Sequence, residues 1–199
     1  MMIRVTKSFF GFASAVVIAC VALVATADEP KGAAAEKQPA KIPPVALSKA
    51  HAALCKVIVG DTMPEITLSP LAGGAPVTLS SLFGEKATVV VFWSPDRRMA
   101  REQLADLGPD VVAPFGESGV AVVGIAVGAP AAMLKAAKRE FPNLLDADGK
   151  AFAEVGSEKL PRTYLLDPQG EILWFDIEYS LGTRRELHQA LRAITGDTD

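Results

Sequence analysis

The sequence predicts an α/β fold, in which a mixed central β-sheet is flanked by helices on both faces. Two apolar runs rich in valine, residues 88–93 and 120–127, have the composition of strands that helices cover on both sides. Between them the apolar residues recur at helical spacing, and two shorter apolar runs flank a turn farther along the chain. Strands that alternate with helices in this way are typical of an α/β domain.

The helix after the first strand is expected to begin at Ser94-Pro95-Asp96. The serine hydroxyl can cap free amides, the proline needs no N–H in a first turn, and the aspartate favours the positive end of the helix dipole. The inward stripe of this helix is Ala100, Leu104 and Leu107, and Gly108-Pro109 is expected to end it.

A second helix is predicted to open at Pro130, with Leu134, Ala137 and Phe141 on one face. Two strands, residues 163–166 and 171–175, are then predicted to form an antiparallel hairpin around the Pro-Gly turn at residues 167–170.

The last helix is marked by Thr183 and Glu186, which have the spacing of a capping box. Its expected inward residues are Leu187, Leu191 and Ile194. Two short strands, near residues 65–68 and 77–79, are predicted ahead of all these elements.

The composition of the 199 residues excludes several classes of protein. Half of the chain is hydrophobic, 22% is charged and only 2 residues are cysteine, which argues against a disordered chain and a disulfide-rich miniprotein. Without residues 1–27 the chain holds 18 basic against 23 acidic residues. An acidic domain without a basic stripe is a poor candidate for nucleic-acid binding.

Residues 1–27 are predicted to be a signal peptide or an N-terminal anchor, because a short basic start precedes a long apolar run and Ala25-Thr26-Ala27. Cleavage, an uncut anchor and lipidation at Cys20 all remain open. Residues 28–56, rich in Ala, Pro, Lys and Glu, are predicted to be a linker, and residues 57–196 the folded domain. The protein is therefore expected to be exported, periplasmic or otherwise extracytoplasmic, and to contact a membrane only through this first segment.

Four stretches match one family in order along the chain: residues 59–64 with 79–82, residues 90–93, residues 141–146, and residues 160–167 with Gly170. They resemble the thioredoxin superfamily, and most closely its exported redoxins. These are the thiol-disulfide oxidoreductases of the bacterial envelope and the alkyl hydroperoxide reductase and thiol-specific antioxidant group. The resemblance implies a thioredoxin-like fold.

In that family a Cys-x-x-Cys pair opens the helix after the Phe-Trp strand, where amide groups and the helix dipole stabilise a thiolate. The resemblance places Arg97 at the first cysteine and Ala100 at the second. The peroxiredoxin frame started at Pro95 likewise meets Met99 and Glu102. Arginine stays protonated and alanine has no thiol, so Ser94, Pro95, Asp96, Arg97 and Ala100 are expected to be the remnant of a catalytic site.

The resemblance also implies a cis peptide bond at Leu160-Pro161 and a groove beside it that pairs with an extended peptide. The expected binding residues are Trp93, Arg97, Arg101, Leu160, Pro161 and Arg162. Arg97, Arg98, Arg101 and Arg162 are candidates for a converging anion or carboxylate pocket, or else for a solvated face balanced by Asp96 and Glu102. Trp93 and Trp174 lie in apolar strands and are expected in the core.

Cys55 is the one thiol that remains if the leader is removed. A small, partly buried residue, a link between chains and a lone peroxide-reactive thiol are the three interpretations.

The sequence predicts no metal site and no cofactor. His51 and His188 lack partners at zinc-ligand spacing, and Gly149 stands fourth rather than sixth in the Asp146-Ala147-Asp148-Gly149 stretch. A turn before a helical segment at residues 150–155 is therefore expected there instead of a calcium loop.

The function expected is that of a redoxin domain without its catalytic cysteines, which binds or scaffolds an extended peptide or a protein partner in the cell envelope. The alternative is a thiol-disulfide oxidoreductase or peroxide-reducing protein that uses Cys55 or the thiols of a partner. A structural domain without a ligand is the third hypothesis.

Overall fold

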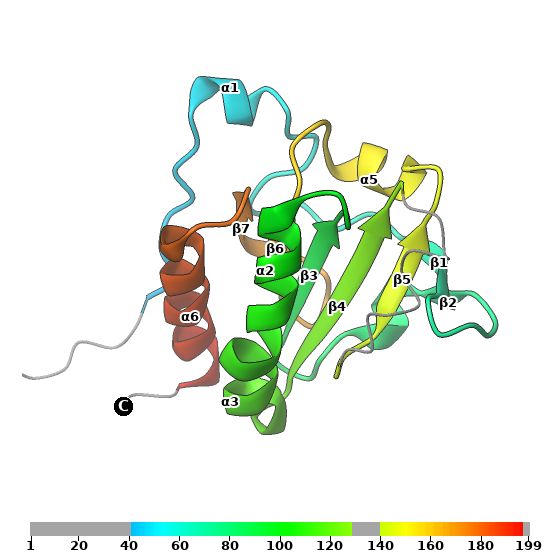
Figure 1. The fold of residues 1–199 in the computed structure, drawn as a ribbon. Helices are drawn as coiled ribbons and strands as arrows, with labels where there is room; N and C mark the ends of the chain where they lie inside the picture. Colours follow the sequence, from blue (N-terminus) through cyan, green and yellow to red (C-terminus); the bar gives the residue numbers. More distant parts are fainter. Residues whose placement is uncertain (1–40, 129–139, 197–199) are drawn as a thin grey trace, which may run out of the picture. The chain divides into compact units, whose positions relative to one another are not determined.

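A single mixed sheet of seven strands, in the order β2-β1-β5-β4-β3-β6-β7, is the centre of residues 41–128 and 140–196, which the computed structural model describes (Figure 1). All of these residues fall within one unit of the chain. The strands are β1 (Thr67–Pro70), β2 (Val77–Thr78), β3 (Ala87–Trp93), β4 (Val120–Val127), β5 (Asn143–Asp146), β6 (Arg162–Leu166) and β7 (Ile172–Ile177).

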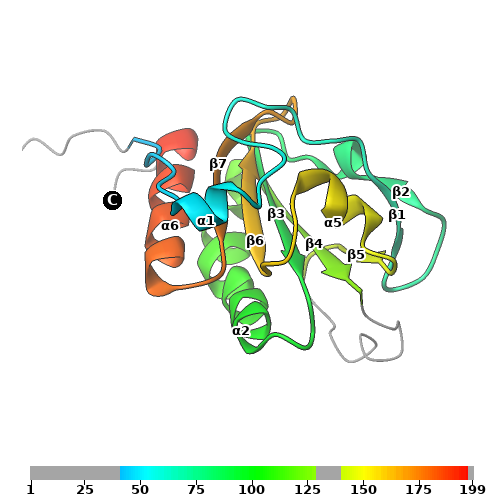
Figure 2. The same ribbon diagram turned by 90° about the horizontal axis from the view of Figure 1, so that it is seen from above.

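Helices cover both faces of this sheet, as Figure 2 shows from above. The helices are α1 (Lys49–Ala52), α2 (Arg98–Leu107), α3 (Ala113–Phe115), α5 (Lys150–Val155) and α6 (Leu181–Thr195), with helical turns η1 (Leu79–Leu82), η2 (Gly108–Val112) and η3 (Gly116–Ser118). The buried side chains of α2, α3 and α6 belong to one core cluster, and those of α5 belong to the other. The predicted α/β class with a flanked mixed sheet is therefore confirmed.

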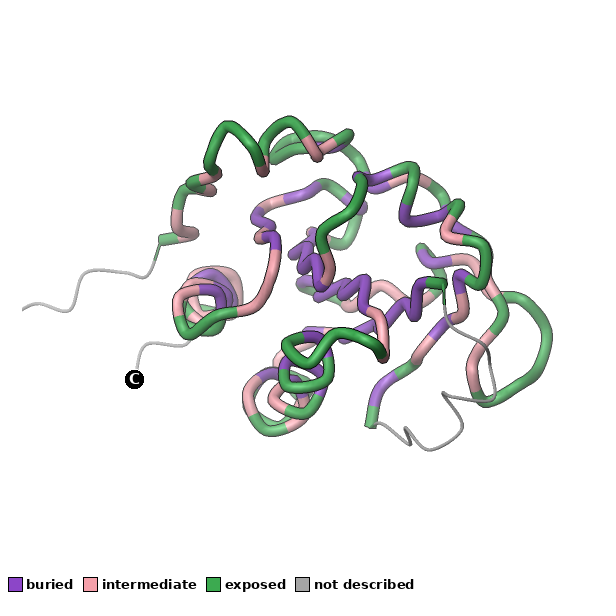
Figure 3. The backbone as a smooth tube through the Cα atoms, turned by 45° about the horizontal axis from the view of Figure 1, so that its top comes forward, coloured by how far each residue is buried: buried purple, intermediate pink, exposed green. Residues whose placement is uncertain are grey.

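Strand β3 is buried along its whole length, and its side chains divide between the two core clusters. Figure 3 shows that buried segments run through the middle of the domain and exposed ones around its outside. Because side chains alternate across a strand, Val89, Val91 and Trp93 face α2 and α6, whereas Val90 and Phe92 face α5. Trp93 and Trp174 are both core residues, as predicted.

The strands predicted at β3, β4, β6 and β7 are confirmed, whereas β5 is a strand that the sequence did not predict. β3 pairs in parallel with β4 and antiparallel with β6, and β6 and β7 form the expected antiparallel hairpin. In its turn, Asp167 Oδ1 accepts the Gln169 N–H at 2.8 Å, and Gly170 adopts a φ of +86°. The early strands lie close to their predicted places, with β1 shifted two residues along the chain.

Helix α2 ends at Leu107 with Gly108 as its C-cap, so the predicted end of this helix at Gly108-Pro109 is confirmed, but the chain remains helical beyond it. The chain continues from α2 through the π-helical stretch η2 into α3. The Ala113 N–H donates to the Gly108 carbonyl, five residues back. This wider turn accommodates Pro109, which lacks the N–H that an α-helical bond would require.

Helix α6 begins three residues earlier than predicted, with Ser180 rather than Thr183 as its N-cap, and its capping box uses different residues. Ser180 Oγ accepts the Thr183 N–H at 3.2 Å, and Thr183 Oγ1 accepts the Ser180 N–H at 3.2 Å. Thr183 is therefore the third residue of the helix, and Glu186 has no part in the cap. The inward stripe is as predicted, with Leu187 and Leu191 buried and Ile194 packed beside them.

The folded part of the chain begins before residue 57, so the linker predicted over residues 28–56 is too long. Ile42, Val45 and Leu47 pack against the core clusters. Gln189 Nε2 of α6 also donates to the Lys41 carbonyl at 3.0 Å. The predicted second helix, with Pro130, Leu134 and Ala137, lies outside the described residues. Phe141, predicted on the same helix face, is buried but lies in a bend before β5, so its placement in a helix is wrong.

Replacing the cap of α6 tests its assignment. Ser180→Ala is expected to lower the free energy of unfolding by about 1 kcal/mol, because the Thr183 amide loses its side-chain acceptor. Glu186→Ala, the matched control, is expected to change it by less than about 0.5 kcal/mol. Urea unfolding followed by tryptophan fluorescence measures both, and the reverse order of effects would restore the cap predicted from the sequence.

Candidate functional site

Three loops meet at one end of the sheet because the register of its strands aligns them. Phe92 of β3 lies opposite Arg162 of β6, and Arg162 lies opposite Ile177 of β7. The loop after β3, the loop before β6 and the loop after β7 therefore emerge side by side. The first leads into α2, the second contains Leu160 and Pro161, and the third leads into α6.

The first loop makes a tight turn before α2 begins. The Arg97 N–H donates to the Ser94 carbonyl at 3.1 Å, which closes a turn around Pro95 and Asp96. Arg97 is the residue before the helix, with an extended backbone and no side chain capping its amides. The prediction that Ser94-Pro95-Asp96 starts the helix is therefore wrong, since the turn keeps the serine hydroxyl away from the free amides.

The two positions that the resemblance assigns to cysteines lie at the start of α2. Arg97 is exposed, whereas Ala100 is completely buried against the core that α2 shares with the sheet. The free amides of this helix are therefore present without a thiol beside them. Cys55, the described cysteine, packs with the opposite core cluster and does not fill either position.

The predicted convergence of four arginines does not occur. Arg98 pairs with Glu102 at 2.9 Å on the surface of α2, and Arg101 Nη1 donates to the Pro95 carbonyl at 2.5 Å. Arg162 lies in β6 with its side chain on the α5 face, opposite to α2. The pleat of the strand accounts for this, because Thr163, the next residue, is the one that contacts Gln103 of α2.

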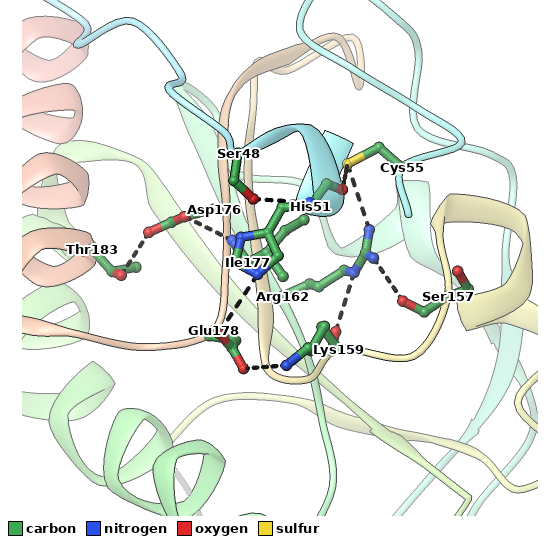
Figure 4. A network of polar contacts seen from close by, with 10 residues as sticks. All are labelled: Ser48, His51, Cys55, Ser157, Lys159, Arg162, Asp176, Ile177, Glu178 and Thr183. Carbon is green, nitrogen blue, oxygen red and sulfur yellow. Dashed lines mark hydrogen bonds and ion pairs between the residues drawn. The ribbon is translucent and has the colours of Figure 1, made fainter. Parts of the chain in front are cut away.

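Arg162 is instead a completely buried residue, so its predicted role in binding a ligand directly is wrong. Its guanidinium donates to three carbonyl oxygens, those of Leu54 at 2.9 Å, Ser157 at 2.8 Å and Lys159 at 3.2 Å. It also lies over the ring of Phe152, 5.5 Å from the centroid. Figure 4 shows the guanidinium between Cys55 and the loop before β6.

The second loop presents free backbone at this end of the sheet. The Leu160-Pro161 peptide bond is cis. The Pro161 carbonyl accepts the Glu178 N–H at 2.8 Å, which ties this loop to the one after β7. Within the described part of the chain the N–H and C=O of Leu160 make no hydrogen bond. Leu160 is half-buried and packs against the core cluster on the α5 side.

A hollow of about 460 Å³ lies between α2 and the start of α6. Its walls are Arg98, Met99, Glu102, Ala105 and Asp106 on α2, and Tyr179, Ser180 and Leu181 after β7. Two large apolar side chains line it while exposed to solvent, Met99 at 37% and Leu181 at 82%. Exposed apolar residues around a concavity are typical of surfaces that bind other chains.

Tyr179 fixes the side of this hollow nearest the sheet. Its hydroxyl donates to Asp106 Oδ2 at 2.6 Å. Arg184 pairs with Asp106 at 3.8 Å and donates to Asp110 Oδ1 at 2.6 Å. Burial, together with the hydrogen bond to Asp106, raises the pKa of Tyr179 well above its ordinary value.

The residues at this site differ from the binding residues that the sequence predicts, as Trp93, Met99, Tyr179 and Leu181 show. Trp93 is only 3% exposed, so it supports the site from the core and offers no surface to a ligand. Met99, Tyr179 and Leu181 were absent from the predicted site. An exposed apolar residue at the start of a helix is the signal that could have found Met99 and Leu181, but only the register of β3, β6 and β7 brings the two helix starts together.

Two other predictions concern the remaining polar motifs. Asp146 caps α5, because its carboxylate accepts the N–H groups of Ala151 and Phe152 at 3.3 and 2.8 Å, and residues 146–149 form the expected turn. Among residues 41–128 and 140–196 no cluster of His, Cys, Asp and Glu could hold a metal. Within these same ranges no helix is long and apolar enough to cross a bilayer.

Comparisons with known proteins identify the family and the fold. The sequence profile described as the AhpC/TSA family matches residues 59–175, more than half of the chain. No curated protein matches the chain significantly.

Solved structures share the fold. A candidate protein disulfide isomerase from Bacteroides thetaiotaomicron superposes with a TM-score of 0.64 at 22% identity, covering 72% of this chain and 94% of its own. A candidate thiol:disulfide interchange protein DsbE from Chlorobium tepidum gives 0.60 at 21% identity, covering 70% and 99%. Peroxidoxin BcpB from Mycobacterium tuberculosis gives 0.55 at 22% identity, covering 68% and 97%.

Removing the Tyr179 hydroxyl tests the contact that holds the hollow. Tyr179→Phe is expected to lower the free energy of unfolding by about 1 kcal/mol near neutral pH. Because the pKa of Tyr179 is raised in the folded state, this contribution is fully present below the ordinary tyrosine pKa of about 10 and is lost as the pH rises above it.

Urea unfolding of both proteins from neutral pH to about pH 11 measures the effect. The difference between wild type and variant should shrink on the alkaline side, and other tyrosines cancel because both proteins contain them. A difference that is constant across this range would contradict the role given to the Tyr179–Asp106 contact.

Proposed function

Because the chain belongs to the AhpC/TSA family and has no cysteine at the start of α2, we propose that it is a redoxin domain that binds an extended peptide or protein segment without thiol chemistry. The proposal assigns the family's peptide groove to this end of the sheet and gives no catalytic role to Ser94, Pro95, Asp96, Arg97 or Ala100.

The chemistry of α2 supports the loss of redox activity. A nucleophilic thiolate must stand beside the free amides of the helix, and a second thiol one turn on must resolve the mixed disulfide. Arg97 brings a permanent positive charge and Ala100 a buried methyl group to these places. Neither side chain can form or break a sulfur–sulfur bond.

The single observation that carries the binding proposal is the unpaired backbone of Leu160, in a loop that the Glu178–Pro161 hydrogen bond ties to the segment lining the hollow of Met99 and Leu181. An extended segment can pair with the Leu160 N–H and C=O as an added strand. Its side chains alternate in direction, so one of them can enter the hollow and contact Met99 and Leu181. Exposed Arg97 and Arg101 flank the same end of α2 and are available to an acidic residue of the partner.

The alternative, an oxidoreductase that uses Cys55, has less support from the geometry. Cys55 Sγ donates to the His51 carbonyl at 3.4 Å and lies 3.9 Å from Arg162 Nη1. Cys55 packs with the core cluster across the sheet from α2, so its thiol does not lie beside the free amides at the start of that helix.

We also propose that the domain works outside the cytoplasm, as the composition of residues 1–27 suggests. The intact mass of the protein purified from its native membrane and soluble fractions tests this. A mass that matches a chain beginning near Asp28 supports export with cleavage. An unprocessed protein in the soluble fraction would contradict export.

Binding is tested with a panel of fluorescent peptides of about ten residues that vary in one apolar position. Fluorescence anisotropy should identify peptides whose affinity falls at least tenfold in the double variant Met99→Lys, Leu181→Lys, because charged side chains would replace the two exposed apolar ones that line the hollow (roughly 1.4 kcal/mol or more). Ile58→Lys is the matched control. Ile58 is 57% exposed and lies near the start of β7, away from Glu178.

Two outcomes would contradict the docking role of the hollow. One is an equal loss of peptide affinity in the double variant and in the Ile58 control, and the other is a wild type that binds no peptide.

Redox activity is tested by restoring sulfur. Wild type and Cys55→Ser are both expected to show no turnover in insulin reduction or peroxide consumption. The double variant Arg97→Cys, Ala100→Cys, made in the Cys55→Ser background, is expected to gain insulin-reducing turnover, because the first thiol then stands beside the free amides of α2. Wild-type turnover that disappears in Cys55→Ser would instead establish the oxidoreductase alternative.

A further inference from the structure

The Arg162 guanidinium joins two parts of the chain that are far apart in sequence. On one side it holds the Leu54 carbonyl, and on the other it holds the carbonyls of Ser157 and Lys159 in the loop that carries Leu160. The first partner belongs to the segment of residues 48–56, here called the N-terminal strap. These bonds therefore link the strap directly to the loop of the proposed peptide groove.

The backbone around Arg162 is shaped to admit it. Cys55 of the strap forms an antiparallel bridge with Gly156, and the Ser157 N–H donates to the Leu54 carbonyl at 3.1 Å. A Cβ at Gly156 would overlap Arg162 Nη1 and lie 2.8 Å from the Leu54 carbonyl oxygen. The φ of Gly156 is 176°, an extended conformation open to any residue, so the glycine is needed for space.

A second connection runs over the outside of the same loop. Glu178 contacts His51 of the strap at 3.8 Å and Lys159 of the loop at 3.2 Å (Figure 4). Glu178 adopts a φ of +69°, which is unfavourable for a residue with a side chain, and it directly precedes Tyr179 at the hollow. The strap, the Leu160 loop and the wall of the hollow are thus in one polar network.

Burial makes this network cooperative. The Arg162 side chain has no access to solvent, and a buried charge is tolerated only while its hydrogen-bond partners are in place. If the strap leaves, the guanidinium loses the Leu54 carbonyl and must shift toward water, which pulls on the Ser157 and Lys159 carbonyls. The positions of strap and loop therefore depend on each other.

We propose that Arg162 is a positioning residue that couples the N-terminal strap to the peptide groove, so that docking of the strap sets the affinity of the Leu160 loop for its peptide. The affinity part rests on the proposed function, whereas the coupling itself does not. A protein segment that binds or displaces residues 48–56 would regulate the groove through this contact.

Amide hydrogen exchange measures the coupling without a ligand. Arg162→Met should accelerate exchange about tenfold or more at three amides: Lys56, which donates to Val155; Ser157, which donates to Leu54; and Glu178, which donates to Pro161. Core amides of β4 and α6 should change much less. Arg162→Lys, which keeps the charge without the planar fork, should give an intermediate effect at the same amides.

A second variant displaces the guanidinium without altering it. Gly156→Ala should reproduce the exchange pattern of Arg162→Met. Gly116→Ala is the matched control, since a Cβ there meets no atom within 4 Å, and it should leave all three amides unchanged. Acceleration that is equal at the strap, the loop and the β4 core would show only a loss of global stability and would overturn the proposal, as would no change at Glu178.

Peptide affinity is the separate readout. The tightest peptide of the anisotropy panel should bind Arg162→Met about tenfold more weakly, although the buried Arg162 cannot touch it. Binding should in turn slow exchange at Lys56 in the wild type, because coupling is reciprocal. Unchanged affinity would overturn the regulatory part, and a wild type that binds no peptide would remove the proposed function while the exchange data still decide the coupling.

Discussion

The register of three neighbouring strands, Phe92 beside Arg162 beside Ile177, is the constraint on which the site depends. β3 is buried on both faces, so a slip of one residue would move its whole set of apolar side chains to the wrong core. That burial fixes where β3 ends and, through pairing, where β6 begins and β7 ends. Apolar packing of the sheet therefore holds three segments together: the turn before α2, the Leu160 loop and the start of α6. The polar contacts between these segments are secondary to this packing.

This arrangement explains how the scaffold keeps its shape with Arg97 and Ala100 at the start of α2. The cysteines of a redoxin lie at a helix start that the sheet already positions, so their loss removes the reacting atoms and leaves the loops in place. Ala100 fills its position as a core residue, and Arg97 occupies an exposed one where a long charged side chain costs little. This end of the sheet holds the unpaired backbone of Leu160 and the hollow that Met99 and Leu181 line.

The sequence correctly predicted the elements that depend on hydrophobic periodicity. It did not predict the contacts that depend on the conformation of the loops. β3, β4 and the hairpin were correctly placed because runs of buried residues with turn residues between them leave few alternatives. The caps of α2 and α6 were wrong, since Ser94 is used in a turn and Ser180 takes the place expected for Thr183. The face of Arg162 was predictable from strand alternation, because Arg162, Tyr164 and Leu166 share one face. The carbonyl oxygens that accept hydrogen bonds from its guanidinium were not predictable, because Leu54 lies more than a hundred residues away in the sequence.

A buried arginine stabilises a fold poorly, because its charge must be desolvated. This fact bears on the role of Arg162. An apolar side chain of similar size between Phe152 and the strap would avoid desolvating a charge, and such replacements are often neutral or stabilising. An apolar side chain, however, would tolerate many positions of the surrounding backbone. A planar guanidinium requires its acceptors in fixed directions, so the Leu54, Ser157 and Lys159 carbonyls must be set together. The gain from Arg162 is therefore defined position rather than free energy, and the loop whose position it defines carries the unpaired backbone of Leu160.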